Sequence, residues 1–207
     1  MLSVGKWVKI TPRNVWVDGE ERYGERRAAD AMLVYVYRQS INSYPKFFKM
    51  DGLSKLGFIA TELLLEGEEM CFEPREDRAV VFFNRGGSIS NDRHYQDTIK
   101  DADNFYPSPA IFVYTLPNIV TGEIAIRNKF YGETSFYVLG EWNPATMIEI
   151  VEGTLASDES VADCVFGLVE YIDGENFEAE LLLVKRDAAD GTLILSEQLL
   201  NEIKNKK

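Results

Sequence analysis

The sequence predicts an α/β fold in which a mixed, mostly parallel sheet is flanked by helices. Residues 109–172 alternate between segments typical of strands and segments typical of helices, in the order strand, helix, strand, helix, strand. Residues 79–83 and 109–115 are apolar runs without polar alternation, as expected of strands buried on both faces. This alternation predicts parallel strands joined by right-handed helical crossovers.

Length and composition indicate a single domain spanning residues 1–207, with enough apolar residues (45%) for a substantial core. The sequence contains no run of about 18 apolar residues, so we expect no membrane span. Residues 1–10 lack the apolar core of a secretion signal. Cys71 and Cys164 have neither metal-ligand spacing nor the pattern of a disulfide framework. We therefore expect a cytoplasmic protein without a membrane partner, a metal or another cofactor.

The net charge of −12 is unevenly distributed along the chain. Residues 1–60 have a balance of +4, whereas residues 61–207 have a balance of −16. A chain this acidic is a poor binder of nucleic acid. The basic first sixty residues could contact an acidic protein, although ordinary solvated surfaces explain the same charges.

The first third of the chain predicts two strands and two helices. Residues 2–10 alternate loosely as a strand, and residues 14–17 with Asp18-Gly19 suggest a short hairpin. Residues 28–41 have a helix-compatible composition. Asp51 is the expected N-cap of a second helix. Its buried face is predicted by apolar residues at helical spacing: Leu53, Leu56, Ala60, Leu63 and Leu64.

The central segment predicts a helix over 118–131 that Gly132 ends, followed by a strand over 134–139. Asn143-Pro144 has the residue types of a helix start, and a further strand is expected over 162–172.

Connections and the C-terminal segment complete the prediction. Residues 84–91 form a Gly-containing turn that lacks the Lys-Ser/Thr of a phosphate-binding loop, and residues 101–109 form a loop. Residues 177–186 predict a strand, residues 187–191 a turn, and residues 193–207 an amphipathic helix.

Four segments in this order resemble motifs of one known family. They are MDGLSKLGFIATELLL (50–65), REDRAVVFFNRGGSIS (75–90), TLPNIVTGEIAIRNKFYG (115–132) and ADCVFGLVEYI (162–172). Over roughly residues 45–190, the chain resembles the N-terminal half of the β-ketoacyl-acyl-carrier-protein synthases (ketosynthases). The resemblance implies a half-unit of the thiolase-like fold.

The chain departs from this family at the position of the catalytic nucleophile. Ketosynthases carry a Cys in the sharp turn after the strand that matches residues 134–139. Alignment from Gly132 places that position at Glu141, and alignment from Asp163 places it near Asn143. Neither these two residues nor Trp142 between them can form the covalent acyl intermediate of a thiol.

Length is a second departure, since complete ketosynthases are roughly twice as long and carry two catalytic histidines in their second half. We therefore expect a truncated half-unit. Its single histidine, His94, follows the Gly86-Gly87 turn and matches neither family histidine.

These departures predict a catalytically degenerate homologue that acts as a partner or scaffold subunit in fatty acid or polyketide-type biosynthesis. The resemblance implies a homodimer, or a heterodimer with an active ketosynthase, and an acyl carrier protein as a possible further partner. The matching dimer interface includes Asn118, Glu123 and Tyr137. A half-unit would also expose apolar surface that its second half would cover.

Two other functions remain open from the sequence. An acyltransferase or decarboxylase-type enzyme could use Glu141 as a general base if burial raised the pKa of its carboxyl, with Tyr137 or His94 assisting. A carrier or sensor could keep an acyl tunnel lined by Phe112, Phe136 and Tyr137, although core packing explains these residues equally well.

The aromatic residues Tyr44, Phe47 and Phe48 also allow two interpretations. They could form a partner-contact surface or an acyl pocket, and packing around a loop is the simpler explanation.

Overall fold

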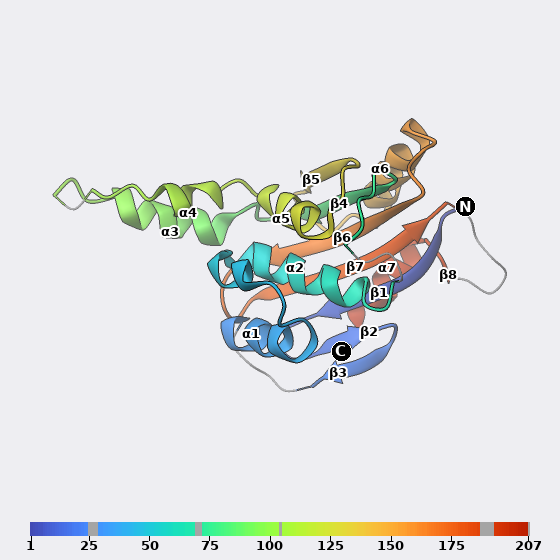
Figure 1. Cartoon of the computed structure of the whole chain (residues 1–207), viewed down its shortest axis with the longest axis horizontal. Helices are drawn as coiled ribbons and strands as arrows, with labels where there is room; N and C mark the ends of the chain where they lie inside the picture. The colour runs from blue at the N-terminus through green and yellow to red at the C-terminus, as the bar shows by residue number, and fades with distance from the viewer. Residues whose placement is uncertain (25–28, 69–71, 104, 187–192, 207) are drawn as a thin grey trace.

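The computed structural model describes all residues except 25–28, 69–71, 104, 187–192 and 207. Its centre is one sheet in the order β3-β2-β1-β7-β6-β4-β5, with β8 also paired to β1 (Figure 1). The strands are β1 (Ser3–Ile10), β2 (Val15–Val17), β3 (Glu20–Tyr23), β4 (Arg78–Asn84), β5 (Thr134–Val138), β6 (Asp163–Tyr171), β7 (Phe177–Lys185) and β8 (Leu193–Ile194). The helices are α1 (Ala29–Ser40), the 3-10 helix η1 (Pro45–Lys49), α2 (Gly52–Leu64), α3 (Ile89–Ile99), α4 (Pro109–Val113), α5 (Ile119–Asn128), α6 (Pro144–Ser157) and α7 (Glu197–Asn205).

The sheet is mixed, as predicted, but parallel pairing does not predominate. Among the described strands, the parallel pairings are those of β4, with β5 on one side and with β6 on the other. The remaining pairings are antiparallel. The reason is short connections: β6 and β7 are joined by a tight turn closed by the Ile172 amide and the Asn176 carbonyl at 2.9 Å. A turn this short permits only an antiparallel hairpin.

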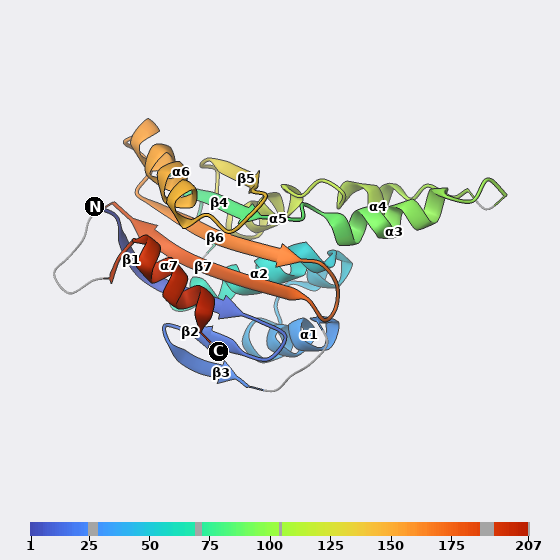
Figure 2. The same ribbon diagram turned by 180° about the vertical axis from the view of Figure 1, so that it is seen from behind.

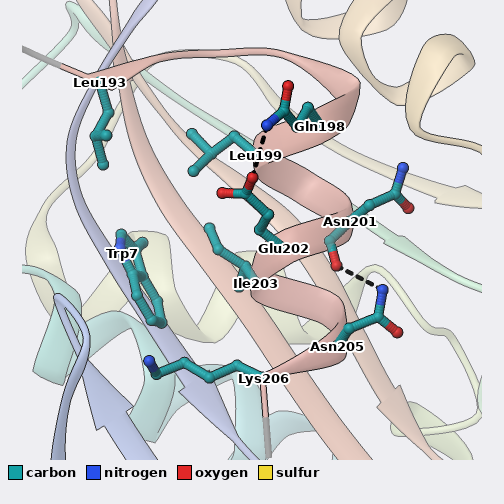
Figure 3. A pocket seen from close by; sticks show the side chains of 9 residues that line it. All are labelled: Trp7, Leu193, Gln198, Leu199, Asn201, Glu202, Ile203, Asn205 and Lys206. Atoms are coloured by element: carbon teal, nitrogen blue, oxygen red, sulfur yellow. Dashed lines mark hydrogen bonds between the residues drawn. The ribbon is translucent and has the colours of Figure 1, made fainter.

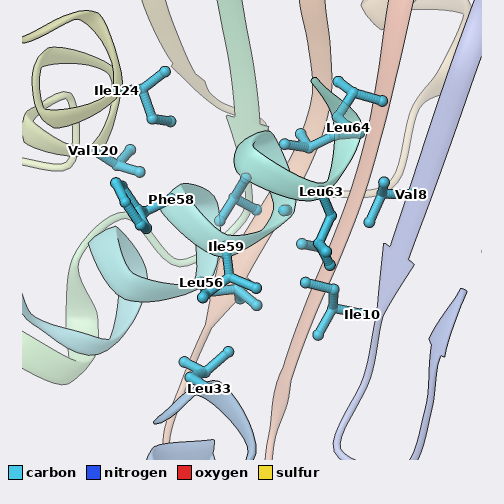
Figure 4. Packing of buried hydrophobic residues seen from close by; sticks show 14 of the residues in the cluster. Val8, Ile10, Leu33, Leu56, Phe58, Ile59, Leu63, Leu64, Val120 and Ile124 are labelled. Carbon is cyan, nitrogen blue, oxygen red and sulfur yellow. The ribbon is translucent and has the colours of Figure 1, made fainter. Parts of the chain in front are cut away.

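Helices cover both faces of the sheet. The helices α1, α2 and α5 lie on one face (Figure 1), and α6 and α7 lie on the other (Figure 2). Each face has its own buried apolar cluster. Figure 4 shows the first cluster, where Leu56, Ile59 and Leu63 of α2 point toward Val8 and Ile10 of β1. The predicted apolar face of α2 is therefore confirmed as core.

Local signals placed several element boundaries correctly. Asp51 caps α2 by accepting from the Ser54 amide at 2.9 Å. Asp18 and Gly19 both have positive φ, which makes the type I′ turn of the predicted hairpin. The end of α5 differs from the prediction, because Lys129 is its left-handed C-cap. A Cβ on Gly132 would collide with the Arg78 carbonyl oxygen, so close backbone packing explains this glycine.

The predicted strand over residues 109–115 is wrong. Residues Pro109–Val113 form the short helix α4, with Pro109 in its first turn and the Ser108 hydroxyl accepting from the Ile111 amide at 3.4 Å. With α3, this helix forms an arm that projects from the sheet (Figures 1 and 2). The apolar run resembled a buried strand because composition alone does not report burial. The loop expected after Asn84 likewise ends early, and α3 begins at Ile89.

Two features named in the sequence analysis fall on residues that the structure does not describe. The predicted turn over 187–191 lies outside the described residues, and so does Cys71. Within the described residues, no helix combines the length and apolar character needed to cross a lipid bilayer.

Candidate functional site

The sequence resemblance predicts the nucleophile position in the turn between β5 and α6, and we call residues 139–143 the elbow. The Leu139 amide donates to the Asn84 carbonyl at 2.8 Å, which holds the elbow beside the end of β4. Asn143 caps α6 as predicted, since its Oδ1 accepts from the Thr146 amide at 3.1 Å. The elbow thus has the expected strand-to-helix geometry.

Glu141 is exposed on the elbow. It lines a concavity of about 440 Å³ together with Leu139, Gly140, Asn143 and Thr146. None of these four neighbours is titratable. A carboxylate that serves as a general base needs desolvation and a proton-transfer partner, and this concavity supplies neither.

Trp142 connects the elbow to α7. Its Nε1 donates to Asn201 Oδ1 at 2.9 Å, and the Lys204 ammonium lies 5.1 Å from the centre of its ring. The residues that meet here are about sixty positions apart in the chain. No local sequence pattern indicates this contact, and the sequence analysis did not find it.

Beneath α7 lies a buried group of charges that the sequence analysis also missed. Lys9 on β1 is 2% exposed, and its ammonium donates to the carbonyls of Ile203 and Lys204 in the last turn of α7. The same ammonium lies 3.4 Å from the carboxylate of Glu180, and Lys204 lies 3.6 Å from it. Burial raises the pKa of Glu180, and the charges of Lys204 and Lys9 partly offset that rise.

The charges continue along the same end of the sheet toward the loop after β4. Lys204 also pairs with Glu178, and Arg85 pairs with Glu178 at 3.4 Å and with Glu170 at 3.1 Å. Glu170 is 2% exposed and accepts from the amides of Arg85 and Gly86. Every carboxylate in this row thus faces a cation, which indicates a structural network rather than a free acid or base.

His94 lies on the arm helix α3 and is exposed. It belongs to a second concavity, of about 500 Å³, that does not include the elbow. Other lining residues include Lys49, Asp51, Lys55 and Tyr114. Burial raises the pKa of Asp51, while burial and then Glu123 raise the pKa of the Tyr114 hydroxyl. The structure therefore does not bring His94 and Glu141 together in one pocket.

The three residues that the resemblance assigns to a dimer interface differ in exposure. Asn118 is exposed before α5. Glu123 is buried, where it pairs with Lys46 at 2.7 Å and accepts from the Tyr114 hydroxyl at 3.1 Å. Tyr137 is half-buried and stacks on Phe83 with ring centres 5.4 Å apart. Asn118 is the member of this set whose side chain faces outward.

The aromatic residues proposed for an acyl tunnel do not share a cavity. Phe136 and Tyr137 are neighbours on β5, so they point to opposite faces and pack against different core clusters. Phe112 lies on the arm and is 49% exposed. Farther back in the chain, Phe47 is buried and Phe48 is 51% exposed, so core packing explains only part of that aromatic group.

A shallow groove of about 770 Å³ runs between α7 and β1 (Figure 3). Leu199 and Ile203 of α7 point across it toward Trp7. The Lys206 ammonium lies 5.8 Å from the ring centre of Trp7 and 4.8 Å from that of Trp16. These contacts anchor the end of α7 to the first strands of the chain.

Cys164 lies fully buried on β6. Burial raises the pKa of its thiol, and the charge of Asp163 adds to that rise. A buried thiol that is hard to ionise is a poor nucleophile.

Several apolar side chains on the edge strand β5, on the helix α5 and on the segments that flank α5 are exposed. Ile126 of α5 is 66% exposed, Tyr131 is 68% exposed, and Val138 of β5 is 54% exposed. Leu116, just before α5, is 49% exposed. We call these four residues the edge patch. The backbone edge of β5 beside it has no paired strand among the described residues.

Comparison with known proteins finds solved structures that share this fold. No protein-family model and no curated protein matches the chain. Among solved structures, the ishigamide ketosynthase/chain length factor superposes with a TM-score of 0.65 at 16% identity. The ketosynthase ApeO in complex with its chain length factor ApeC, from Xenorhabdus doucetiae, gives 0.60 at 15% identity. The chain has a ketosynthase fold.

A third match is a type II polyketide ketosynthase bound to its acyl-carrier protein (AntDE:AntF), with a TM-score of 0.57 at 14% identity. The three alignments cover 91%, 91% and 89% of this chain. They cover 63%, 80% and 63% of the matching chains, so this chain spans less than two thirds of the ishigamide ketosynthase/chain length factor. The predicted ketosynthase-type fold, a mixed sheet flanked by helices, is thereby confirmed.

Proposed function

We propose that this chain is a partner subunit that pairs with an active ketosynthase in polyketide-type or fatty acid biosynthesis in the cytoplasm. The observation that carries the proposal is the edge patch beside the unpaired edge of β5. An exposed strand edge with apolar neighbours is a surface on which another chain can add a strand. Solved complexes that pair a ketosynthase with a chain length factor support the choice of partner.

The two outer strands of the sheet support the choice of surface. The edge strand β3 carries the exposed charged residues Glu20, Glu21 and Arg22, which discourage strand addition. The edge strand β5 instead presents the exposed Val138, and Ile126 of the adjoining helix α5 is also exposed. Association is therefore favoured at β5.

Loss of condensing activity in this subunit is the second part of the proposal. It is supported by an elbow without Cys, Ser or Thr at 141–143 and by the contact of Trp142 with α7. The alternative, an acyltransferase or decarboxylase-type enzyme built on Glu141, has less support because Glu141 is exposed and lacks a titratable neighbour in its concavity.

An acyl carrier protein is a possible further partner. Lys49 and Lys55 line the second concavity, in the basic first third of the chain. Acidic carrier proteins would be attracted to these side chains. Replacing both with Glu should weaken carrier binding at low salt, whereas replacing Lys100 on the arm should not.

The proposal is tested by purifying the chain from its own cells under native conditions and identifying the chains that accompany it by mass spectrometry. A second chain with a ketosynthase Cys and catalytic histidines is the expected result. Ile126→Asp and Val138→Asp should each weaken this association by about 2 kcal/mol or more, roughly thirtyfold, because a charge would be buried unpaired. Leu193→Asp is the matched control, since Leu193 is 49% exposed but lies beside α7.

Two results would contradict the proposal. The first is a chain that purifies alone and does not bind an active ketosynthase produced in the same cells. The second is a covalent acyl adduct on this chain, detected by intact-mass measurement after incubation with an acyl thioester.

A further inference from the structure

The C-terminal helix α7 is held to the sheet by a small apolar face and by charged groups at its last turn. Within this nine-residue helix, Leu200 and Ile203 are the buried residues. The Lys9 ammonium of β1 donates to the carbonyls of Ile203 and Lys204, at the end where the helix dipole attracts a cation. A helix this short is marginal on its own in water, so these contacts decide whether α7 stays docked.

The carboxylate beneath this turn, Glu180 of β7, is incompletely compensated. It is 2% exposed, and neither of its oxygens has a hydrogen-bond partner among the described residues. Its cations, Lys9 on β1 and Lys204 on α7, lie 3.4 and 3.6 Å away, whereas a charged hydrogen bond is about 2.8 Å long. Glu178, two positions along β7, adds a like charge, and the apolar Leu168 of β6 lies opposite. An ionised Glu180 is therefore unfavourable while α7 covers it.

The same helix also holds the elbow. Trp142 Nε1 donates to Asn201 Oδ1 at 2.9 Å, and the Lys204 ammonium lies 5.1 Å from the centre of the Trp142 ring. Lys204 thus lies close to both Glu180 and Trp142. A movement of α7 that separates Lys204 from Glu180 therefore also releases Trp142.

We infer that α7 is a strap that opens as a unit when Glu180 is ionised, and that its opening releases Trp142 and the elbow. Opening admits water to Glu180 and Lys9, so both charges become solvated. The strand pairings of the sheet do not involve α7, so the rest of the fold stays in place. This device does not depend on the proposed pairing with a ketosynthase.

The direction of the pH dependence follows from the burial of Glu180. Burial raises the pKa of this carboxyl in the docked state, so docking favours the protonated form. Docking is therefore strongest below the pKa of the open state, and it weakens as pH rises through the pKa of the docked state. With Glu180 protonated, Lys9 still donates to the last carbonyls of α7, which keeps its charge compensated.

Hydrogen–deuterium exchange of the full chain, measured by mass spectrometry from about pH 5 to about pH 8, tests the strap, with rates normalised to the unfolded chain at each pH. Protection of the α7 amides should fall by about tenfold or more across this range, since one proton shifts an equilibrium by at most about tenfold per pH unit. The helix α6 covers the same face of the sheet, and its buried residues are Met147, Val151, Thr154 and Leu155. Its protection should change by less than about twofold.

Tryptophan fluorescence reports the same opening, because all three tryptophans of the chain contact α7 or its C-cap residue Lys206. The Lys206 ammonium lies near the rings of Trp7 and Trp16, and Trp142 is bonded to Asn201. The difference in emission between wild type and Trp142→Phe isolates the elbow. This difference should shift to longer wavelength with the same pH midpoint as the exchange of α7.

Two matched variants identify the responsible group. Glu180→Gln removes the ionisable carboxyl and keeps its size, so protection of α7 should become independent of pH within about twofold. Glu202→Gln, the same change at an exposed position of α7, should keep the wild-type dependence.

Four results would overturn the inference and leave the proposed function standing. The first is protection of α7 that does not depend on pH in the wild type, and the second is a Glu180→Gln variant that retains the dependence. The third is loss of protection in α6 together with α7, which would show global unfolding. The fourth is a Trp142 signal that does not follow the exchange of α7.

Discussion

The side of the molecule formed by α6 and α7 and the side formed by α5 and β5 differ in the apolar surface that they leave in water. On the first side, α7 covers the sheet, and its outer residues, such as Glu197, Asn201 and Glu202, are polar and exposed. On the second side, the edge patch remains in water. None of the described large hydrophobic residues with high exposure belongs to α6 or α7, although Leu193 of β8, beside α7, is 49% exposed.

This difference bears on the proposed association of the chain with a partner. A truncated half was expected to expose apolar surface that a second half would cover. The described helices instead cover both faces of the sheet, and most of the described large hydrophobic residues with high exposure lie in the edge patch or on the arm. We therefore expect changes on the α7 side to alter folding stability and changes on the edge side to alter association.

The largest effect on stability should come from Lys9→Met. This change leaves Glu180 without its nearer cation and removes the donor to the last carbonyls of α7. A buried charge pair that loses one partner costs about 3–5 kcal/mol in the free energy of unfolding, measurable by urea denaturation. The double variant Lys9→Met/Glu180→Leu should recover most of the loss.

Lys6→Met is the control on the same strand, because the contact that Lys6 makes with the described residues is an exposed hydrogen bond to the Glu66 carbonyl. Its cost should stay below about 1 kcal/mol. Lys9→Met could instead dissociate the complex with the partner and leave the free energy of unfolding unchanged. That result would contradict the assignment of stability to the α7 side and of association to the edge side.

The free energy of unfolding, measured at several pH values, also tests the role of the buried charges on the α7 side. Burial places the folded-state pKa of Glu180 above its unfolded value, so the folded state binds the proton more tightly. The resulting stabilisation is fully present below the unfolded pKa and is lost as pH rises through the folded pKa. Wild type should therefore gain stability relative to Glu180→Gln as pH falls from about 8 toward about 4.5, by about 1.4 kcal/mol for each tenfold difference in proton affinity between the folded and unfolded states. A difference that is independent of pH would contradict the assigned burial.

Trp142→Phe should have a smaller effect on stability, about 1 kcal/mol, because it removes the hydrogen bond to Asn201 and retains an aromatic ring. Asn201→Ala should cost a similar amount, and the double variant should cost less than the two single costs added together. Additive costs would show that Trp142 and Asn201 do not interact.

The smallest effect is expected for Glu141→Gln. Because Glu141 is exposed, its replacement should change stability by less than about 0.5 kcal/mol and leave the affinity for the partner unchanged. Turnover by the purified complex should also remain within about twofold. A large loss of turnover would support the enzymatic function centred on this carboxylate.

The sequence alone determined most element positions and the identity of the fold. The caps Asp51 and Asn143 and the Asp18-Gly19 turn act within a few residues, so their signals are readable locally. The apolar periodicity of α2 likewise reports a buried face through residue spacing alone. The order of four family-like segments predicted the ketosynthase fold, which the structural matches support.

Tertiary structure decided the features whose cause is distant in the chain. The apolar segment at 109–115 could be a buried strand or an exposed helix, and only its position on the arm selects the helix. The pairing of Lys9 with Glu180, and of Trp142 with Asn201, depends on how strands and helices are brought together across more than fifty residues. Burial and long-range charge are properties of the assembled layers, so a single sequence does not encode them in any local pattern.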